Sequence, residues 1–346
     1  IADLPDCTTR DISKALVRLR SQVGAVTLGR VMTLIVVTDE DNADAAVDAA
    51  AEASREHPSR ILALVRGSGR TASRLDAQVR VGGDAGVSEL VVMRSFGELA
   101  SHAGSVVTPL LLPDSAVVAW WPGEGEKDLA GSSVGMLAGR RITDVSLAPG
   151  PRRALRVRAD NYSPGDTDMA WSRTTRWRAL LATALDQMPF ESVQSVTVKG
   201  ASDSASADLI AAWLGVRLRC PVERIDGPAG VGLMSVRLDR ASGPIVLERA
   251  ADTSQATLTQ PGQQPRPFPL PRPTTAQALS EELRHLDKDE VYRRALKPLD
   301  PAGAARKEPG GRGRVPESRR RAATRRCSGR PLRGATRRSC PSRCSR

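Results

Sequence analysis

Apolar residues in the first 145 positions fall into runs that predict buried strands alternating with helices. Residues 9–22 carry apolar side chains at spacings of three and four, which predicts an amphipathic helix that Thr9 can cap. Residues 31–37 and 61–65 are continuous apolar runs of strand length, as in strands buried on both faces. Between them, the Ala-rich stretch 42–56 is helical in character. Strand, helix and strand in this order predict a βαβ unit.

The next segments predict that the sheet of this unit is mixed. Residues 75–81 alternate apolar and polar positions, which is typical of a half-exposed strand. Residues 89–93 and 116–121 are further apolar strands, and Pro122-Gly123 ends the second of them. We therefore expect an N-terminal α/β domain over 1–150 with at least one antiparallel strand.

The second half repeats the mixture of helices and strands after a connection at 146–168 that is rich in Pro, Gly and Arg. Apolar spacing predicts a helix around 177–188, another that begins near 204, and two short closing helices. Alternation at 194–199 and at 234–247, with a turn at Ser242-Gly-Pro244, predicts strands and a hairpin. We expect a C-terminal α/β domain over 151–300.

Charge divides the chain at position 300. Of the 51 basic and 39 acidic residues, 15 basic and two acidic residues lie at 301–346, which leaves 36 basic and 37 acidic residues before them. The net charge of +12 therefore describes the tail and not the predicted domains. The tail contains no Ile, Phe, Tyr, Trp or Met, so we expect it to be disordered. An out-of-frame reading of GC-rich DNA would give the same composition.

Cysteine usage and hydropathy bear on location. Only Cys7 and Cys220 of the five cysteines precede the tail, which suits a reducing compartment and gives no disulfide framework. The longest aliphatic runs are too short to span a bilayer, and the first ten residues are not a signal peptide. We expect a cytoplasmic protein with no membrane partner.

The motifs for nucleotide binding and hydrolysis are incomplete. The turn Thr38-Asp-Glu-Asp41 places carboxylates where a Rossmann dinucleotide site needs glycine for the pyrophosphate. Gly131-Ser-Ser-Val-Gly135 fits the nucleophile elbow in letters, but the charged segment 124–128 precedes it instead of a buried strand. A small-residue loop is favoured, and a hydrolase at Ser133, with His285 downstream, stays an alternative.

Metal and nucleic-acid chemistry are weakly supported. His57, His102 and His285 are far apart in the sequence, and the tail cysteines Cys327, Cys340 and Cys344 have no near fourth ligand. We predict no metal and no cofactor. The basic tail lacks the interleaved aromatic residues that stack on bases, so nucleic-acid binding through it would be non-specific and would weaken with salt.

Two clusters combine tryptophan with charge, the first at 120–124 and the second at 162–178. One interpretation is interdomain packing, with Asp166 or Asp168 capping the long helix that follows and pairing with arginines. The other is a partner contact, because Trp and Arg are favoured at binding hot spots. The candidate partner-binding residues are Trp120, Trp121, Asp166, Asp168, Trp171, Arg173 and Arg176.

The chain also resembles a known family, the OpcA family. The resemblance covers about 1–296 and lies in ordered motifs. They include Lys14-Ala-Leu-Val-Arg-Leu-Arg20, Ser54-Arg-Glu-His-Pro58, Arg74-Leu-Asp-Ala-Gln78, Trp120-Trp-Pro-Gly123, Arg140-Arg-Ile-Thr-Asp144, Pro164-Gly-Asp-Thr-Asp168 and Glu281-Glu-Leu-Arg284.

The resemblance implies a two-domain α/β protein without catalysis of its own. It implies a role in the assembly and allosteric activation of glucose-6-phosphate dehydrogenase, in the oxidative pentose phosphate pathway of carbohydrate metabolism. This chain departs from the family pattern at Thr174-Thr-Arg176, where Leu-Thr-Pro is expected, and in the Arg/Pro-rich stretch 146–158. The resemblance ends after Leu296, and redox regulation is not carried over to the tail cysteines.

Overall fold

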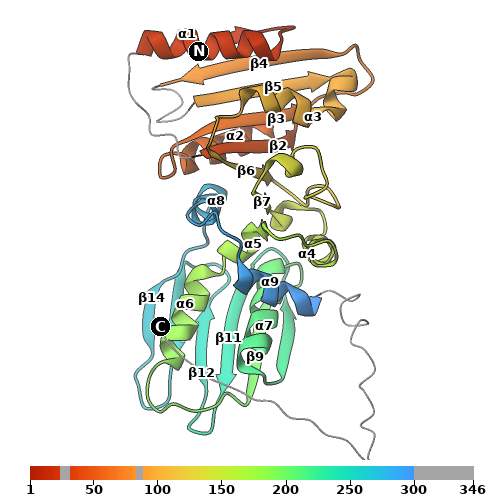
Figure 1. Cartoon of the computed structure of the whole chain (residues 1–346). Coiled ribbons are helices and arrows are strands. Elements are labelled where there is room, and N and C mark those ends of the chain that lie inside the picture. The colour runs from red at the N-terminus through yellow and green to blue at the C-terminus, as the bar shows by residue number, and fades with distance from the viewer. Residues whose placement is uncertain (24–31, 83–88, 300–346) are drawn as a thin grey trace, which may run out of the picture. The chain divides into compact units, whose positions relative to one another are not determined.

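The computed structural model describes residues 1–23, 32–82 and 89–299. These residues form an eight-stranded and a six-stranded sheet, each packed against helices (Figure 1). Both sheets contain parallel and antiparallel pairs, so the predicted α/β class with mixed sheets is confirmed. The predicted disorder of 301–346 lies outside the described residues.

The first sheet contains a six-stranded parallel core. Its strands are β1 (Ala2–Leu4), β2 (Met32–Asp39), β3 (Ser59–Arg66), β4 (Arg74–Val81), β5 (Glu89–Phe96), β6 (Ala116–Trp121), β7 (Arg140–Thr143) and β8 (Asp166–Asp168). They lie in the order β1-β4-β5-β3-β2-β6-β7-β8, with β4 antiparallel to both neighbours. From β5 to β8 the pairs are parallel, and their order is the 3-2-1-4-5-6 of a Rossmann sheet.

The second sheet is mainly antiparallel. Its strands are β9 (Ser195–Ala201), β10 (Val222–Gly227), β11 (Leu233–Asp239), β12 (Ile245–Arg249), β13 (Gln255–Thr259) and β14 (Arg266–Pro269), in the order β10-β9-β11-β12-β13-β14. Only β9 and β10 pair in parallel, as a crossover through a helix requires. The predicted hairpin is the β11–β12 pair.

The described helices lie between the strands and cover the sheets. They are α1 (Thr9–Val23), α2 (Ala43–Ala53), α3 (Ala103–Val107), α4 (Pro151–Asp160), α5 (Met169–Ser172), α6 (Thr175–Leu185), α7 (Ala205–Leu218), α8 (Thr275–Leu283) and α9 (Glu290–Leu296), besides short 3-10 turns.

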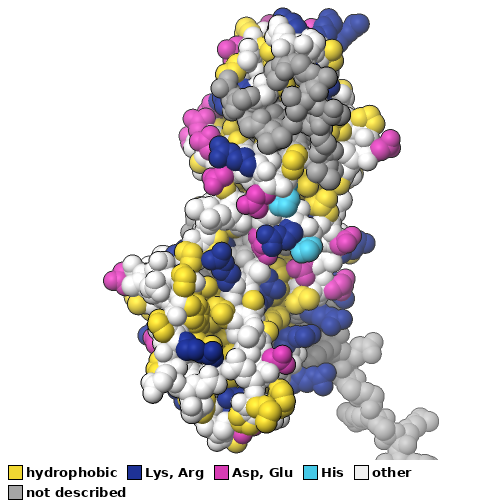
Figure 2. Space-filling model, turned by 90° about the vertical axis from the view of Figure 1, so that its left-hand side faces the viewer, with side chains coloured by type: hydrophobic (Ala, Val, Ile, Leu, Met, Phe, Trp, Pro, Cys, Tyr) yellow, Lys and Arg dark blue, Asp and Glu magenta, His cyan; other side chains and the backbone are white. Residues whose placement is uncertain are grey.

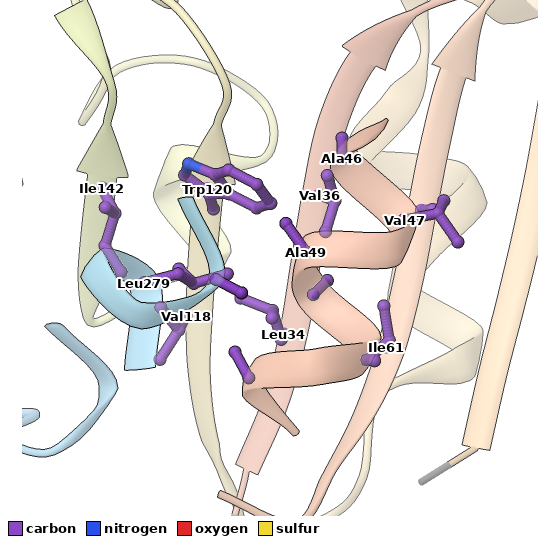
Figure 3. Close-up of a cluster of buried hydrophobic side chains, with 14 of the residues drawn as sticks. Leu34, Val36, Ala46, Val47, Ala49, Ile61, Val118, Trp120, Ile142 and Leu279 are labelled. Atoms are coloured by element: carbon purple, nitrogen blue, oxygen red, sulfur yellow. The ribbon is translucent and has the colours of Figure 1, made fainter. Parts of the chain in front are cut away.

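The two faces of the first sheet have separate cores. Alternate residues of its parallel strands pack under α2 and α8 on one face, and under α1 and α3 on the other. Figure 3 shows the first of these cores, where side chains of α2 and Leu279 of α8 meet Leu34, Val118 and Trp120. Burial on both faces explains why the central strands are continuous apolar runs. Helix α8 comes late in the chain, yet it completes the core of the first sheet.

Two sequence predictions are corrected by the structure. The stretch 146–168, predicted as a connection, contains helix α4 and strand β8. Pro151 stands in the first turn of α4, where a missing amide hydrogen costs nothing. The N-cap of α1 is Thr8 and not Thr9, because the Thr8 hydroxyl accepts from the Asp11 amide (3.3 Å) and the Asp11 carboxylate accepts from the Thr8 amide.

Candidate functional site

Both tryptophans of the first candidate cluster lie in the interior. Trp120 is 0% and Trp121 is 4% exposed, at the carboxyl end of β6. Successive residues of a strand point to opposite faces, so Trp120 packs in the core under α2 and α8, and Trp121 in the core under α1 and α3. Neither ring offers a surface to a partner in this conformation.

Asp168 caps helix α5 from a fully buried position. Its carboxylate accepts hydrogen bonds from the Ala170 amide (2.8 Å), the Thr143 hydroxyl (2.6 Å) and the Val145 amide (3.1 Å). Burial, with a smaller contribution from the charge of Asp144, raises the pKa of Asp168 to about 7. This carboxyl is thus poised to change its charge near neutral pH without touching solvent.

Arg173 is held by a second buried carboxylate. Asp144 is 0% exposed, and it accepts from Arg173 Nη1 at 2.6 Å and from Nη2 at 2.7 Å. This is a bidentate pair, the strong form of the arginine–carboxylate interaction. It ties the end of α5 to the residue that follows β7.

Asp166 and Trp171 make further links in the same region. Asp166 Oδ1 accepts from Arg141 Nε at 2.5 Å, and burial raises the pKa of Asp166 although the Ser163 amide and Arg141 oppose that shift. Trp171 is 1% exposed, and its indole Nε1 donates to Asp289 at 2.8 Å. The guanidinium of Arg178 lies 3.7 Å from the centre of the Trp171 ring, a cation–π contact.

The candidate residues therefore differ in what they can reach. Trp120, Trp121, Asp166, Asp168 and Trp171 are buried, Arg173 is partly exposed and Arg176 is exposed. The five buried residues make contacts inside the fold, and Asp168 caps the short helix α5, not the long helix α6 that the sequence predicted it to cap. A direct partner contact by candidate side chains is open to Arg176 and to the exposed part of Arg173.

The place of a Rossmann nucleotide site is lined by acids. A cavity of about 420 Å³ lies at the carboxyl ends of β2 and β6, where the strand order reverses and such folds bind ligands. Its lining includes Asp39, Glu124 and Glu126, with one arginine, Arg66. Asp39 also accepts from the Asn42 amide (3.1 Å), so the turn before α2 is closed by a carboxylate. The carboxylates of this crevice would repel a pyrophosphate.

The segment 131–135, which matches the nucleophile-elbow pattern in sequence, lies in a loop. Ser132 is buried and donates to the Leu129 carbonyl (2.8 Å), while Ser133 is exposed between short turns and follows no strand. His285 is exposed beyond α8. An elbow requires a strand-to-helix turn, which these residues do not form.

Other functional classes leave few features in the described part of the chain. Within 1–23, 32–82 and 89–299, no cluster of three or more His, Cys, Asp or Glu side chains could hold a metal ion. None of the described helices combines the length and apolar character needed to cross a membrane. Figure 2 shows basic and acidic side chains interspersed on one face, as the near-neutral count before residue 300 predicts.

Several residues that organise this region were not singled out from the sequence. Asp144, Asp289 and Tyr292 complete the contacts of the candidate cluster, and Arg140 pairs with buried Glu282 of α8 at 2.8 Å. Arg249 is a buried arginine of β12 in another cavity. Local patterns do not show which distant residues meet. Arg140, Asp144 and Glu282 stand in motifs of the family resemblance, and the inward position of Arg249 is a second usable signal.

Comparison with solved structures finds distant likenesses. KijD10, a 3-ketoreductase from Actinomadura kijaniata, matches with a TM-score of 0.44 and 10% identity over 78% of this chain and 95% of its own. A putative myo-inositol dehydrogenase from Sinorhizobium meliloti matches at 0.40 and 11%, over 77% and 94%. At these scores the likeness says nothing about function. The search of curated proteins gave no match.

Comparison with family models identifies two domains of one family in this chain. The model described as glucose-6-phosphate dehydrogenase subunit N-terminal domain matches residues 50–160, and the corresponding C-terminal domain model matches residues 164–296. Together they cover well over half of the 346 residues, in the order in which the two sheets occur. The chain belongs to the OpcA family of glucose-6-phosphate dehydrogenase subunits.

Proposed function

We propose that this chain is a non-catalytic assembly factor and activator of glucose-6-phosphate dehydrogenase in the cytoplasm. The observation that carries the proposal is the match of both halves, 50–160 and 164–296, to the two domain models of the dehydrogenase subunit family. We propose 1–150 and 151–300 as the two domains along the sequence, with β8 and α8 of the second segment adding to the first sheet and its core.

The acidic crevice supports a role without dinucleotide chemistry. The fold retains the strand order of a nucleotide-binding sheet, but Asp39, Glu124 and Glu126 line the place where a pyrophosphate would lie. An activator needs no reactive centre. It needs tighter binding to the active state of its partner than to the inactive state, and about 1.4 kcal/mol of difference gives a tenfold shift in the equilibrium.

The test is co-purification of the full chain with glucose-6-phosphate dehydrogenase from the same source, followed by the dehydrogenase rate and mass with and without the chain. A complex with a changed rate or oligomeric state is expected. A mixture that elutes as two separate proteins, with an unchanged rate, would contradict the proposal.

Arg176 is the candidate contact residue that a variant can test most cleanly. It is exposed and borders a hollow with Glu281 and Arg284, so its substitution leaves the buried cluster intact. Arg176→Ala is expected to weaken the complex without changing the melting temperature. Arg18→Ala, on the exposed side of α1, is the matched control. Equal affinity of the two variants would remove Arg176 from the contact surface.

A further inference from the structure

A cavity of about 260 Å³ opens beside the amino end of α7, where α6 and the loops of the second sheet meet. Figure 1 shows α6 and α7 on the same side of this sheet. The lining contains three arginines and one carboxylate: Arg173, Arg249, Arg272 and Asp203. Asp144 already neutralises Arg173, and Asp203 offsets one of the other two arginines, which leaves one positive charge in excess.

Arg249 is a buried cation without a counterion among the residues that the structure describes. It ends β12 and is 5% exposed, with its guanidinium 5.3 Å from the centre of the Trp177 ring. Nη1 and Nη2 donate to the carbonyls of Leu270 (2.9 Å) and Leu233 (3.0 Å). Within the described residues, Nε has no acceptor and no carboxylate pairs with this side chain.

This burial is unfavourable for the charged form of Arg249. Burial, together with the nearby charge of Arg272, lowers the pKa of Arg249 to about 10, which still leaves it charged at neutral pH. Carbonyl oxygens satisfy hydrogen bonds but do not balance a full charge. An anion in the cavity would supply the missing counterion.

The amino end of α7 adds donors to the same wall. Ser204 caps this 14-residue helix by accepting from the Ala207 amide at 3.2 Å. Ala205 and Ser206 also line the cavity, and because they belong to the first turn of α7 their amides have no helical acceptor. The positive end of the helix dipole therefore lies beside the cavity, as do the arginines.

Arg272 is fixed at the mouth of the cavity. Its Nη2 donates to the carbonyls of Val231 and Ala251, both at 2.8 Å, which holds the exposed side chain in place. Gly232, on the same wall, has a φ of +70° and brings backbone without a side chain to the lining. A fixed cation and bare backbone suit a compact, highly charged group.

We propose that this cavity binds the phosphate group of a small phosphorylated metabolite, with Arg249 and Arg272 as its cations and the Ala205 and Ser206 amides as donors. The volume of about 260 Å³ admits a phosphate and a few further atoms, which is below the usual range of drug-sized sites. Asp203 offers acceptors to a ligand hydroxyl at the rim. The site does not depend on the proposed dehydrogenase partnership.

The test uses the full chain alone, so it is independent of any complex. Isothermal titration with inorganic phosphate and with glucose 6-phosphate, at constant ionic strength, is expected to give saturable binding. Glucose at the same concentrations is expected to give none. Absence of binding by both phosphates, or equal binding of glucose and its phosphate, would overturn the proposal.

Two substitutions with opposite expected effects on phosphate affinity make the test more specific. Arg272→Gln is expected to weaken phosphate binding about tenfold, as loss of a charged hydrogen-bonding group does. Asp203→Asn removes a repelling charge and is expected to tighten it. Arg237→Gln, an exposed arginine of β11 that does not line the cavity, is the control.

Arg249→Met removes two bonds to backbone carbonyls and is expected to destabilise the fold, so the surface-accessible variants decide the outcome. Unchanged binding by Arg272→Gln, or an equal loss with Arg237→Gln, would show that this cavity is not the site.

Discussion

Arg173→Met is expected to lower the free energy of unfolding by about 3 kcal/mol. Asp144 is fully buried, and its carboxylate accepts hydrogen bonds from both terminal nitrogens of Arg173, at 2.6 and 2.7 Å. Removing one partner of a buried pair costs about 3–5 kcal/mol, because the other charge stays buried without compensation. The Arg173 side chain is 18% exposed, so water can reach the vacated space, and the lower end of that range applies.

Urea unfolding followed by tryptophan fluorescence measures this loss. Trp120, Trp121, Trp171 and Trp177 are buried, so unfolding changes their surroundings. With an m-value of about 3 kcal/mol/M, a loss of about 3 kcal/mol moves the midpoint by about 1 M. Arg176→Met is the matched control, because Arg176 lies three residues away and is exposed. It should stay within about 0.5 kcal/mol of the parent.

A double variant separates the pair from its surroundings. Asp144→Asn combined with Arg173→Met should cost less than the sum of the two single losses, because each single variant leaves one charge unpaired. A midpoint for Arg173→Met equal to that of Arg176→Met would refute the reasoning, and so would strict additivity in the double variant.

Three further predictions follow from the same contacts. Asp168 has a raised folded-state pKa of about 7 against an ordinary 3.8, so the folded chain holds this proton more tightly than the unfolded chain. Its stabilising contribution is therefore complete below about pH 4 and is lost as the pH rises through about 7. Melting temperatures measured across that window should show a slope that Asp168→Asn reduces; an equal slope in the variant would contradict the assignment. Leu279→Ala should lower the free energy of unfolding by about 2–5 kcal/mol, because Leu279 of α8 is 0% exposed and packs on the first sheet. Urea unfolding measures the loss, with Arg284→Ala as the control. With saturating inorganic phosphate present to occupy the proposed phosphate cavity, NADP⁺ should show no saturable binding in equilibrium dialysis, because carboxylates line the crevice at β2 and β6. Saturable binding there would mean that these acids face away from the ligand.

Much of the first sheet could be predicted because its central strands bury both faces. Runs such as 31–37 and 61–65 need no partner to be recognised as strands. Strand β8 was not predicted, because its residues are Asp-Thr-Asp and not apolar. Hydrogen bonds from Arg141 to Asp166 and from Thr143 to Asp168 compensate for the burial of these carboxylates. Helix α4 escaped because four arginines and a proline resemble a connection, although Ala154 and Leu155 pack inward.

The candidate cluster shows a different limit of sequence patterns. Tryptophans and arginines are favoured both in interfaces and in packed junctions, so composition alone left two interpretations. What separates them is the position of acceptors far along the chain: Asp289 lies 118 residues from Trp171, and Asp144 lies 29 residues from Arg173. No local period encodes such distances.

Arg249 illustrates a signal that the sequence did contain. In β12, Ile245, Leu247 and Arg249 share one face by the two-residue period of a strand, and the first two are fully buried. An arginine in an inward position predicts either a buried acidic partner or a ligand. The structure places only carbonyl acceptors against it among the described residues, which removes the first option. Phosphate titration of Arg272→Gln against Arg237→Gln therefore tests the remaining one.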